Sequence, residues 1–266
     1  MPPITVFIGS GNQSLLERKV LIYSLLKHSQ RSLDIRVFDG TNNTVIMAGG
    51  SQTAPMSKEL QRRNLTEFSL YRYLIPQLMS FTGKAIYLDS DMLCLTDIAE
   101  LVELPLEDKD FLCTKAYKDG NGDLMWATSA LLINCDRCRF DLPQIFSEID
   151  RGLFSYTDFS QMGRSFLEVH PYLIGKLNGE WNVFDKHDAA TNIIHYTDLR
   201  TQPWRFRSHP YGGIWFQYFE EARTAGHVTD EDIRYAIANG YARRDLLEGN
   251  NPSLKVQVKS WFSALR

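Results

Sequence analysis

The sequence has no apolar run that approaches the ~20 residues a helix needs to span a bilayer. Its first residues, MPPITVFIGSG, also lack the basic segment of a signal peptide and lead directly into a β-rich stretch. These two absences predict a cytoplasmic protein.

An excess of charge of either sign is missing too. The 266 residues carry 29 Lys and Arg against 32 Asp and Glu, which gives a net charge of −3. Without a global positive field, no nucleic-acid partner is expected. A hydrophobic fraction of 44% and an aromatic fraction of 12% are instead typical of a soluble globular protein with a substantial core.

Cysteine is scarce, with four residues in the chain. Cys94, Cys113 and Cys135 lie in or beside apolar stretches, where a free thiol behaves as a small hydrophobic side chain. Cys135 and Cys138 form a CxxC, but a structural zinc site needs four ligands, and no second CxxC or His pair has the right spacing. The pattern therefore favours buried thiols over a metal or redox site.

Periodicity indicates how the first half of the chain is organised. Residues 4–9 (ITVFIG) and 33–40 (LDIRVFDG) are short β-type runs that end in Gly, and residues 15–29 between them have apolar residues at helical spacing. Strand, helix and strand at this spacing predict a βαβ unit with parallel strands. The Gly-, Ser- and Asn-rich residues 41–57 predict a long loop.

The alternation of strands and helices continues to about residue 150. The pattern predicts a helix over 66–79, strands over 84–95, 110–117 and 129–136, and a helix over 142–153. The expected fold class is therefore α/β, an open sheet flanked by helices. In such sheets ligands bind beyond the carboxyl ends of the strands.

The last third of the chain is expected to be helical. Residues 213–222 are an aromatic-rich helix candidate, and residues 229–240 combine a capping box, Thr229 to Asp232, with a terminal Gly. The tail SLKVQVKSWFSALR (253–266) leaves two interpretations open. It is a helix packed on the domain, or it contacts an anionic membrane surface, which would place the protein peripherally at the inner membrane face.

Two aspartates one residue apart, Asp89 and Asp91 in YLDSDMLCLTD, stand near the end of the predicted 84–95 strand. In an extended chain they would point to the same side and converge. Like charges held close need a cation or several donors, and such oxygen ligands suit Mg²⁺ or Mn²⁺. The pair alone leaves open a phosphatase with Asp89 as nucleophile, or a divalent ion on the diphosphate of a nucleotide sugar.

Four stretches of sequence favour the nucleotide-sugar alternative over the phosphatase. TEFSLYRYLIPQL and then KAIYLDSDMLCLTDIAELVEL resemble an Arg-bearing helix that leads into an apolar strand ending in DxD. WATSALLINCDR resembles an NSG strand, and NIIHYTDLRTQPWR resembles an HxxG…KPW motif. In this order, over residues 4–205, they are similar to glycosyltransferase family 8, the glycogenin-like and bacterial lipopolysaccharide galactosyltransferase-like enzymes.

The resemblance implies a GT-A fold with a Rossmann-like, mostly parallel sheet. It implies a nucleotide-sugar-binding catalytic domain over residues 1–205 and a helical C-terminal extension over 206–266. The implied activity is transfer of a sugar, with retention of configuration, from a nucleotide-diphosphate donor, expected to be UDP-linked. The acceptor would be a hydroxyl of a glycan, a glycolipid or a small molecule.

The resemblance also implies residue roles. Asp89, Asp91 and His195 would bind Mn²⁺ or Mg²⁺, which stabilises the charge that develops on the diphosphate. Asp158 matches the acidic residue of a DQ pair beside the sugar, and Gln161 is expected to replace the lost Gln as the second catalytic residue. The residues expected to bind the donor are Ile8, Ser10, Asn12, Arg72, Ser90, Thr128 and Gln202.

Four positions depart from the family pattern. NSG has become ATS at 127–129, DQ has become Asp158-Phe159, the Lys of KPW has become Gln202, and Ser10 stands where the family has an Asp facing the nucleobase. Arg205 and Arg207 are alternative sources of the lost phosphate-binding charge. These losses leave open a catalytically impaired relative that binds a nucleotide or a glycan.

Overall fold

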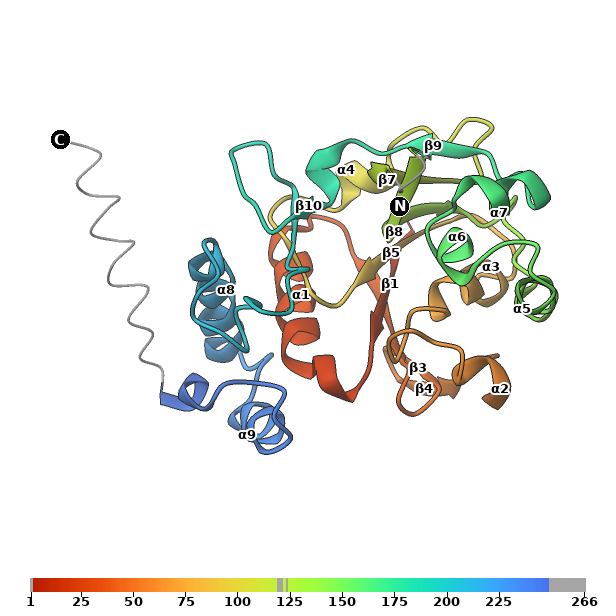
Figure 1. Ribbon diagram of the computed structural model, residues 1–266. Helices are drawn as coiled ribbons and strands as arrows, with labels where there is room; N and C mark the ends of the chain where they lie inside the picture. The colour runs from red at the N-terminus through yellow and green to blue at the C-terminus, as the bar shows by residue number, and fades with distance from the viewer. Residues whose placement is uncertain (1, 119–121, 123, 249–266) are drawn as a thin grey trace. The chain divides into compact units, whose positions relative to one another are not determined.

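The computed structural model describes residues 2–118, 122 and 124–248 (Figure 1). Contacts divide the chain into two compact units. The first consists of Met1–Asn12, Ser29–Asp89 and Asp97–Asn182, and the second of Gln13–His28, Ser90–Thr96 and Val183–Arg266.

The first unit is built on an eight-stranded sheet with the order β4-β3-β2-β1-β5-β8-β7-β9. The strands are β1 (Ile4–Ser10), β2 (Leu33–Asp39), β3 (Thr44–Met47), β4 (Gly50–Thr53), β5 (Lys84–Asp89), β7 (Phe111–Lys118), β8 (Leu124–Asn134) and β9 (Ile174–Lys176). β1 runs parallel to both β2 and β5, as does β9 to β7, while β8 is antiparallel to β5 and β7. The predicted open α/β sheet is confirmed.

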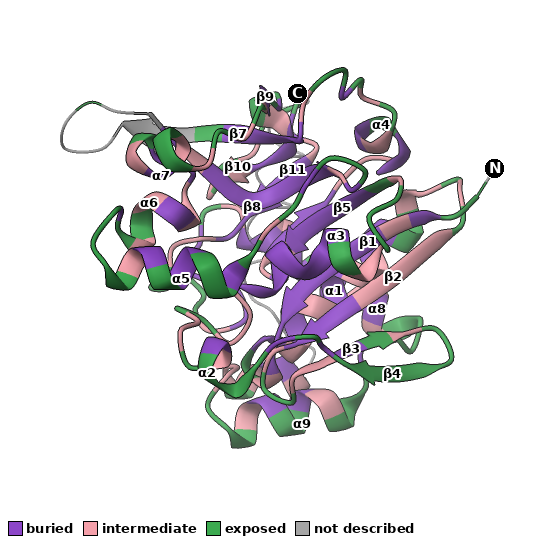
Figure 2. Ribbon diagram, turned by 90° about the vertical axis from the view of Figure 1, so that its right-hand side faces the viewer, coloured by how far each residue is buried: buried purple, intermediate pink, exposed green. Residues whose placement is uncertain are grey.

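Burial explains why the central strands are so apolar. β1 has no exposed residue and β5 only its first, whereas every residue of the edge strand β4 is exposed (Figure 2). A strand covered on both faces gains stability from a continuous apolar run, which is the pattern of residues 4–9.

Short helices cover one face of this sheet, among them α3, α5, α6 and α7 (Figure 1). The helical segments of the first unit are α2 (Lys58–Gln61), η2 (Tyr71–Leu74), α3 (Ile75–Leu78), α4 (Ala99–Val102), α5 (Leu142–Asp150), α6 (Tyr156–Ser160), α7 (Arg164–Val169) and η3 (Gly179–Trp181). Aromatic rings dominate the core between them, with Phe159 contacting Tyr73 at 4.5 Å and Phe166 at 5.2 Å between ring centroids.

The second unit has a three-stranded sheet with the order β10-β11-β6. Its strands are β6 (Met92–Cys94), β10 (Val183–Phe184) and β11 (Ile193–His195), and its helices are α1 (Leu15–His28), α8 (Gly212–Thr224), α9 (Asp230–Ala238) and the 3₁₀ turn η4 (Arg244–Glu248). Another 3₁₀ turn, η1 (Asn12–Ser14), precedes α1. α1 packs on β6, α8 and α9, and Lys19 pairs with Asp232 at 2.6 Å. The predicted helices at 15–29, 213–222 and 229–240 and the Thr229–Asp232 capping box are confirmed.

The loop predicted over 41–57 was wrong in its middle, where β3 and β4 form a hairpin. Met47 pairs with Gly50, so Ala48 and Gly49 make a two-residue connection, with Gly49 at φ 91°. Glycine adopts positive φ without a Cβ clash, which allows this tight turn. The composition rich in Gly, Ser and Asn therefore marks a hairpin turn and an exposed edge strand.

The helix predicted over 66–79 was only partly right. The chain forms η2 and the single turn α3, and Pro76 stands in the first turn of α3. Proline lacks the N–H that a continuing helix would need, but it fits the first turn of a new one. One long helical pattern is thus divided into two short segments.

The strand predicted over 84–95 is divided as well. β5 ends at Asp89, Ser90 and Asp91 form a turn, and β6 begins at Met92 in the other sheet. The expectation that both carboxylates point to one side of a continuous strand was therefore wrong. The DxD pair lies at the turn between a strand of the large sheet and a strand of the small one.

Two further expectations concern cysteine and membranes. Cys135 and Cys138 are buried free thiols, and burial raises the pKa of Cys135 to about 12. Within residues 2–118, 122 and 124–248, no helix combines the length and apolarity needed to cross a bilayer. The tail 253–266, for which packing on the domain and contact with a membrane were both left open, lies outside the described residues.

Phe38 tests the core of the first unit. Its side chain is fully buried and stacks on Phe7 with 5.2 Å between ring centroids. We expect Phe38→Ala to lower the free energy of unfolding by about 3–5 kcal/mol, through lost burial and the cavity left behind. Urea denaturation measures the change.

Leu65→Ala is the matched control, because Leu65 belongs to the same unit and is 79% exposed. It should change the free energy of unfolding by less than about 0.5 kcal/mol. Equal effects of the two substitutions would contradict this packing.

Candidate active site

Asp89 ends β5 at the centre of the large sheet, opposite Gly9 of β1. Its Oδ1 accepts a hydrogen bond from the Tyr87 hydroxyl at 2.5 Å and one from Arg72 Nη2 at 3.1 Å. Tyr87 precedes Asp89 by two residues, so both side chains leave the strand on the same side. A Cβ on Gly9 would lie 2.2 Å from the Tyr87 hydroxyl, so glycine leaves the space which that hydroxyl occupies.

Arg72, the second donor to the Asp89 carboxylate, is itself held by several hydrogen bonds. It is 7% exposed and donates to the carbonyl oxygens of Ser69 and Thr128 and to Thr128 Oγ1, at 3.0, 2.5 and 3.1 Å. Its guanidinium lies 4.7 Å from the centre of the Tyr87 ring. Burial works to lower the pKa of Arg72, but the Asp89 carboxylate and nearby tyrosines raise it further, so Arg72 stays charged.

Asp91 and His195 are brought together inside the second unit. β6 pairs antiparallel with β11, which places His195 opposite Met92, and the Tyr196 N–H donates to the Asp91 carbonyl oxygen at 2.9 Å. His195 Nε2 then lies 3.0 Å from Asp91 Oδ1. Strand pairing therefore joins two residues that are 104 positions apart in the sequence.

The Asp91 carboxylate has the properties expected of a metal ligand. Within the described part of the chain, Asp91 Oδ1 is buried and has no aligned hydrogen bond, although His195 Nε2 is so near. One ligand atom each from Asp89, Asp91 and His195 can be chosen so that all lie within 4.8 Å of one another. Two carboxylates and one imidazole are a chemically suitable set for Mn²⁺, so the residues fit a divalent cation.

Glu17 is a further buried acid that the sequence interpretation missed. It stands in the first turn of α1 and is 5% exposed. Burial raises the pKa of Glu17 to about 8 and the charge of Asp91 adds to this, while its own backbone N–H and the charges of Arg205 and Arg18 oppose it. A signal was present, since Glu17 shares helical spacing with the buried Val20, Leu21 and Ser24.

The residues expected at the nucleoside follow β1. Ile8 is fully buried within the strand, and the buried Ser10 hydroxyl donates to the Gly11 carbonyl oxygen at 3.3 Å. The Asn12 N–H donates to Thr41 Oγ1, which itself donates to Glu67 at 2.7 Å. Thr41 and Glu67 thus hold the turn after β1, and the sequence interpretation did not single them out.

Other predicted donor residues make contacts within the protein. The Thr128 hydroxyl donates to the Ser160 carbonyl oxygen at 2.8 Å in addition to accepting from Arg72. Ser90 is buried in the turn, and Gln202 donates to the Tyr196 carbonyl oxygen at 3.1 Å. These three donor-binding roles remain predictions.

The two residues expected to replace the family's lysine have different surroundings. Arg207 pairs with Asp245 at 2.5 Å, so its charge is already engaged. Arg205 contributes positive charge near Glu17, and its Nε is buried without a hydrogen-bond partner among the described residues.

The predicted catalytic pair lies on α6. Asp158 completes a capping box with Ser155, whose hydroxyl and N–H donate to Asp158 Oδ2 at 2.6 and 3.0 Å. Burial works to raise the pKa of Asp158, but hydrogen bonds from Ser155 and Ser165 lower it overall. Gln161 ends α6 and is half-buried. Helix capping accounts for Asp158, and a catalytic role for either residue remains a prediction.

Solved structures with the same arrangement define the class of fold. The galactosyltransferase LgtC, solved with donor and acceptor sugar analogs, is 15% identical, with a TM-score of 0.64 over 86% of this chain and 98% of LgtC. The glycosyltransferase GlyE of Streptococcus pneumoniae is 16% identical, with a TM-score of 0.56 over 91% of this chain and 65% of GlyE. The expected GT-A fold is confirmed.

A family model matches part of the sequence. The model for glycosyl transferase family 8 matches residues 27–130, a segment that contains Arg72, Asp89, Asp91 and Thr128. The predicted resemblance to family 8 is confirmed over this segment, and the chain is a glycosyltransferase. Protein CDI of Arabidopsis thaliana is similar over a longer range, with 26% identity over 252 residues, 89% of each protein.

Arg72 should be needed for the stability of the first unit. We expect Arg72→Leu to lower the free energy of unfolding by at least about 2 kcal/mol, because Asp89 loses its partner cation and two carbonyl oxygens lose their donor. Urea denaturation measures this loss.

Arg62→Leu serves as the control, because Arg62 is exposed and, among the described residues, forms no ion pair. We expect it to have an effect within about 0.5 kcal/mol. If Arg72→Leu changed the free energy of unfolding as little as Arg62→Leu, the ion pair between Arg72 and Asp89 would not be needed for stability.

Glu17 should make stability depend on pH. Its pKa rises from 4.5 to about 8 on folding, so between these pH values the unfolded chain releases a proton that the folded chain keeps. The free energy of unfolding should therefore fall by up to about 1.4 kcal/mol per pH unit as pH rises through this window.

Glu17→Gln removes this titration. The stability of the variant relative to the parent should rise across the window and stay constant below pH 4.5, as followed by urea denaturation at a series of pH values. A difference that does not vary with pH would show that Glu17 titrates normally in the folded chain.

Proposed function

We propose that this glycosyltransferase moves a sugar from a UDP-linked donor to a hydroxyl of a glycan, glycolipid or small molecule, with retention of configuration. Asp89, Asp91 and His195 would hold the Mn²⁺ or Mg²⁺ that the reaction uses. The observation that carries this proposal is the buried Asp91 Oδ1, which lies beside His195 Nε2 without an aligned hydrogen bond among the described residues.

A divalent cation bound here would stabilise the negative charge that develops on the diphosphate leaving group. The chain's own contribution is to orient the ligands. Tyr87 and Arg72 donate to the same oxygen of Asp89 and restrict its carboxylate to one direction. The charge of Arg72 also offsets part of the repulsion between Asp89 and Asp91.

The nucleoside would lie over the end of β1. The backbone of Ile8, Ser10 and Asn12 is held there by strand pairing and by the contact of Asn12 with Thr41. Ser90 would contact the donor from the DxD turn, with Thr128, Gln202 and Arg72 as the further donor-binding residues. Asp158 and Gln161 would act beside the sugar.

A second candidate is a relative that binds a nucleotide or glycan without turnover. It is favoured by the structural engagement of Thr128 and Asp158, whose side chains bond to Arg72 and Ser155. Tight binding of UDP and Mn²⁺ with no transfer from any sugar donor would support this candidate over the enzyme.

A thermal-shift screen tests the donor and the metal together. We expect UDP to raise Tm in the presence of Mn²⁺ and to have little effect in EDTA, because a ligand that binds only the folded state stabilises it. Asp91→Asn should abolish the Mn²⁺-dependent part of the Tm increase caused by UDP, since the substitution removes the charge of one proposed metal ligand.

Asp108→Asn is the control, because Asp108 is an exposed acid with a side chain 62% exposed and paired with Lys109. It should keep the full UDP response. Stabilisation by UDP that is unchanged in EDTA, or that survives in Asp91→Asn, would refute a metal-dependent donor site.

A further inference from the structure

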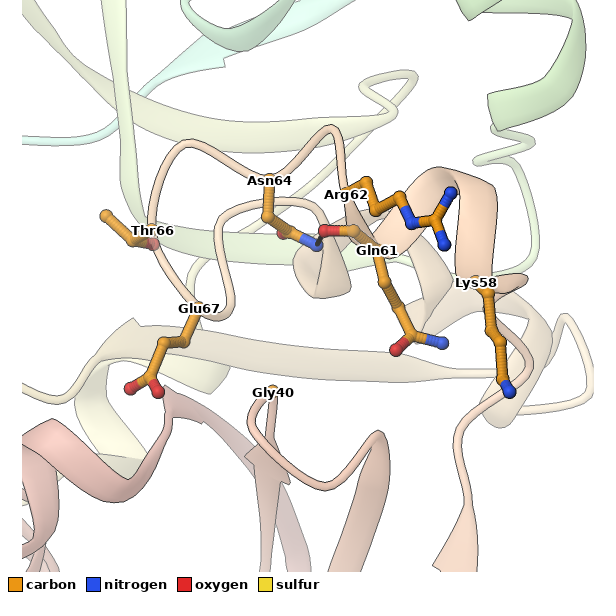
Figure 3. Close-up of a pocket in the computed structure, with 7 residues that line it drawn as sticks. All are labelled: Gly40, Lys58, Gln61, Arg62, Asn64, Thr66 and Glu67. Atoms are coloured by element: carbon orange, nitrogen blue, oxygen red, sulfur yellow. Dashed lines mark hydrogen bonds between the residues drawn. The ribbon is translucent and has the colours of Figure 1, made fainter.

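A polar pocket of about 480 Å³ lies within the first unit, beside the residue that follows β2 (Figure 3). Its floor is Gly40, and its wall is formed by α2 and the chain after it. A Cβ on Gly40 would lie 1.8 Å from the Glu67 carbonyl oxygen, so these two backbone segments approach closely only because residue 40 is glycine.

Two cations line one end of this pocket, Lys58 in α2 and Arg62 at its C-terminal end. Both are exposed, and among the described residues neither side chain takes part in a hydrogen bond or an ion pair. The adjacent Arg63 differs, because it forms two hydrogen bonds to Asp150 at 2.8 and 2.5 Å. The charge of Lys58 and Arg62 is thus available to a ligand.

Two amide side chains between the ends are held in place. Asn64 Oδ1 accepts from the Leu70 N–H at 2.7 Å, and Asn64 Nδ2 donates to the Gln61 carbonyl oxygen at 3.1 Å. Gln61 Nε2 donates to the Met56 carbonyl oxygen at 3.2 Å. Figure 3 shows both amides between the cations and Glu67, at the opposite end of the pocket. Asn64 Oδ1 also accepts from the Ser69 hydroxyl and Asn64 Nδ2 donates to Met56 Sδ, so this amide is fully used within the protein. Gln61 Oε1 has no hydrogen-bond partner among the described residues and can accept from a ligand hydroxyl, at a low entropic cost because the amide is already fixed.

The position of the pocket relates it to Asp89 in the same unit. Gly40 follows β2 and Asp89 ends β5, and both strands run parallel to β1 between them. Their carboxyl ends therefore lie at the same edge of the sheet, two strand spacings or about 10 Å apart. A substrate in the pocket would be within one or two sugar units of Asp89.

We propose that this pocket binds the acceptor, and that the acceptor is a saccharide with an anionic group, a carboxylate or a phosphate. Lys58 and Arg62 pair with the anion, Gln61 Oε1 accepts from a hydroxyl, and Glu67 at the far end repels the anion and so sets the orientation. The inference rests on the proposed function, in which a divalent cation held by Asp89, Asp91 and His195 would neutralise the donor's diphosphate, so that the diphosphate does not need Lys58 and Arg62.

NMR titrations of the full chain in EDTA, with glucuronate, glucose 6-phosphate, glucose and inorganic phosphate as probes, test the pocket. We expect both anionic sugars to bind roughly tenfold more tightly than glucose, since charge-assisted hydrogen bonds contribute the difference. The double variant Lys58→Gln/Arg62→Gln should lose that factor. Tighter binding of glucuronate or of glucose 6-phosphate distinguishes a carboxylate from a phosphate acceptor.

Lys176→Gln is the control, because Lys176 is an exposed cation on β9, at the opposite edge of the same sheet. It should leave all four affinities unchanged. Equal affinity for glucose and the anionic sugars would overturn the proposal. So would inorganic phosphate binding as tightly as glucose 6-phosphate, which would mean an adventitious ion only, or anionic sugars binding the double variant undiminished.

The Mn²⁺-dependent response to UDP is measured on the parent protein in parallel. If UDP raises Tm in a Mn²⁺-dependent way but the protein binds glucose and the anionic sugars equally well, only the acceptor proposal is refuted. If the response is absent while the pocket selects anionic sugars, the proposed donor chemistry fails and the assignment of the pocket as an acceptor site fails with it.

Discussion

The ion pair between the buried Arg72 and the partly buried Asp89 is the interaction on which the candidate site depends. Arg72 reaches Asp89 from η2 and also donates to Ser69 and Thr128, so one guanidinium joins η2, β5 and β8. A buried guanidinium without a partner anion is costly, and Asp89 supplies that anion to Arg72. The pair therefore positions Asp89 and stabilises the sheet around it at the same time.

A second constraint is the break in the chain at Ser90. β5 belongs to the large sheet and β6 to the small one, so the two carboxylates of the DxD pair are held by different strand partners. Pairing of β6 with β11 then brings His195 to Asp91. Asp91 and His195 are therefore brought together by strand pairing inside the second unit.

Residues that depart from the family motifs make hydrogen bonds within the protein. Thr128, where the family has a sugar-orienting triplet, hydrogen-bonds Arg72, and Asp158 caps α6. Gln202 donates to the backbone of Tyr196 where the family has a phosphate-binding lysine. The three candidate ligands Asp89, Asp91 and His195 match the family pattern, while the groups that depart from it form hydrogen bonds within the fold. Lys58 and Arg62, at the same edge of the large sheet, are charges without a hydrogen-bond or ion-pair partner among the described residues.

The sequence by itself determined the elements whose signals are local. The apolar runs of β1, β2 and β5, the spacing of α1 and the capping box of α9 follow from pattern and propensity, and the ordered motifs were enough to predict the resemblance to glycosyltransferase family 8. The β3–β4 hairpin and the division at Pro76 were missed, because a Gly-rich stretch fits either a loop or a turn, and helical spacing continues across a proline.

Only the tertiary structure decided which side chains support the ligands. Tyr87 needs the space at Gly9, burial in the second unit raises the pKa of Glu17, and the pocket at Gly40 depends on the approach of Glu67. Each is set by contacts between segments distant in the sequence, and the burial and geometry that such contacts create cannot be obtained from periodicity.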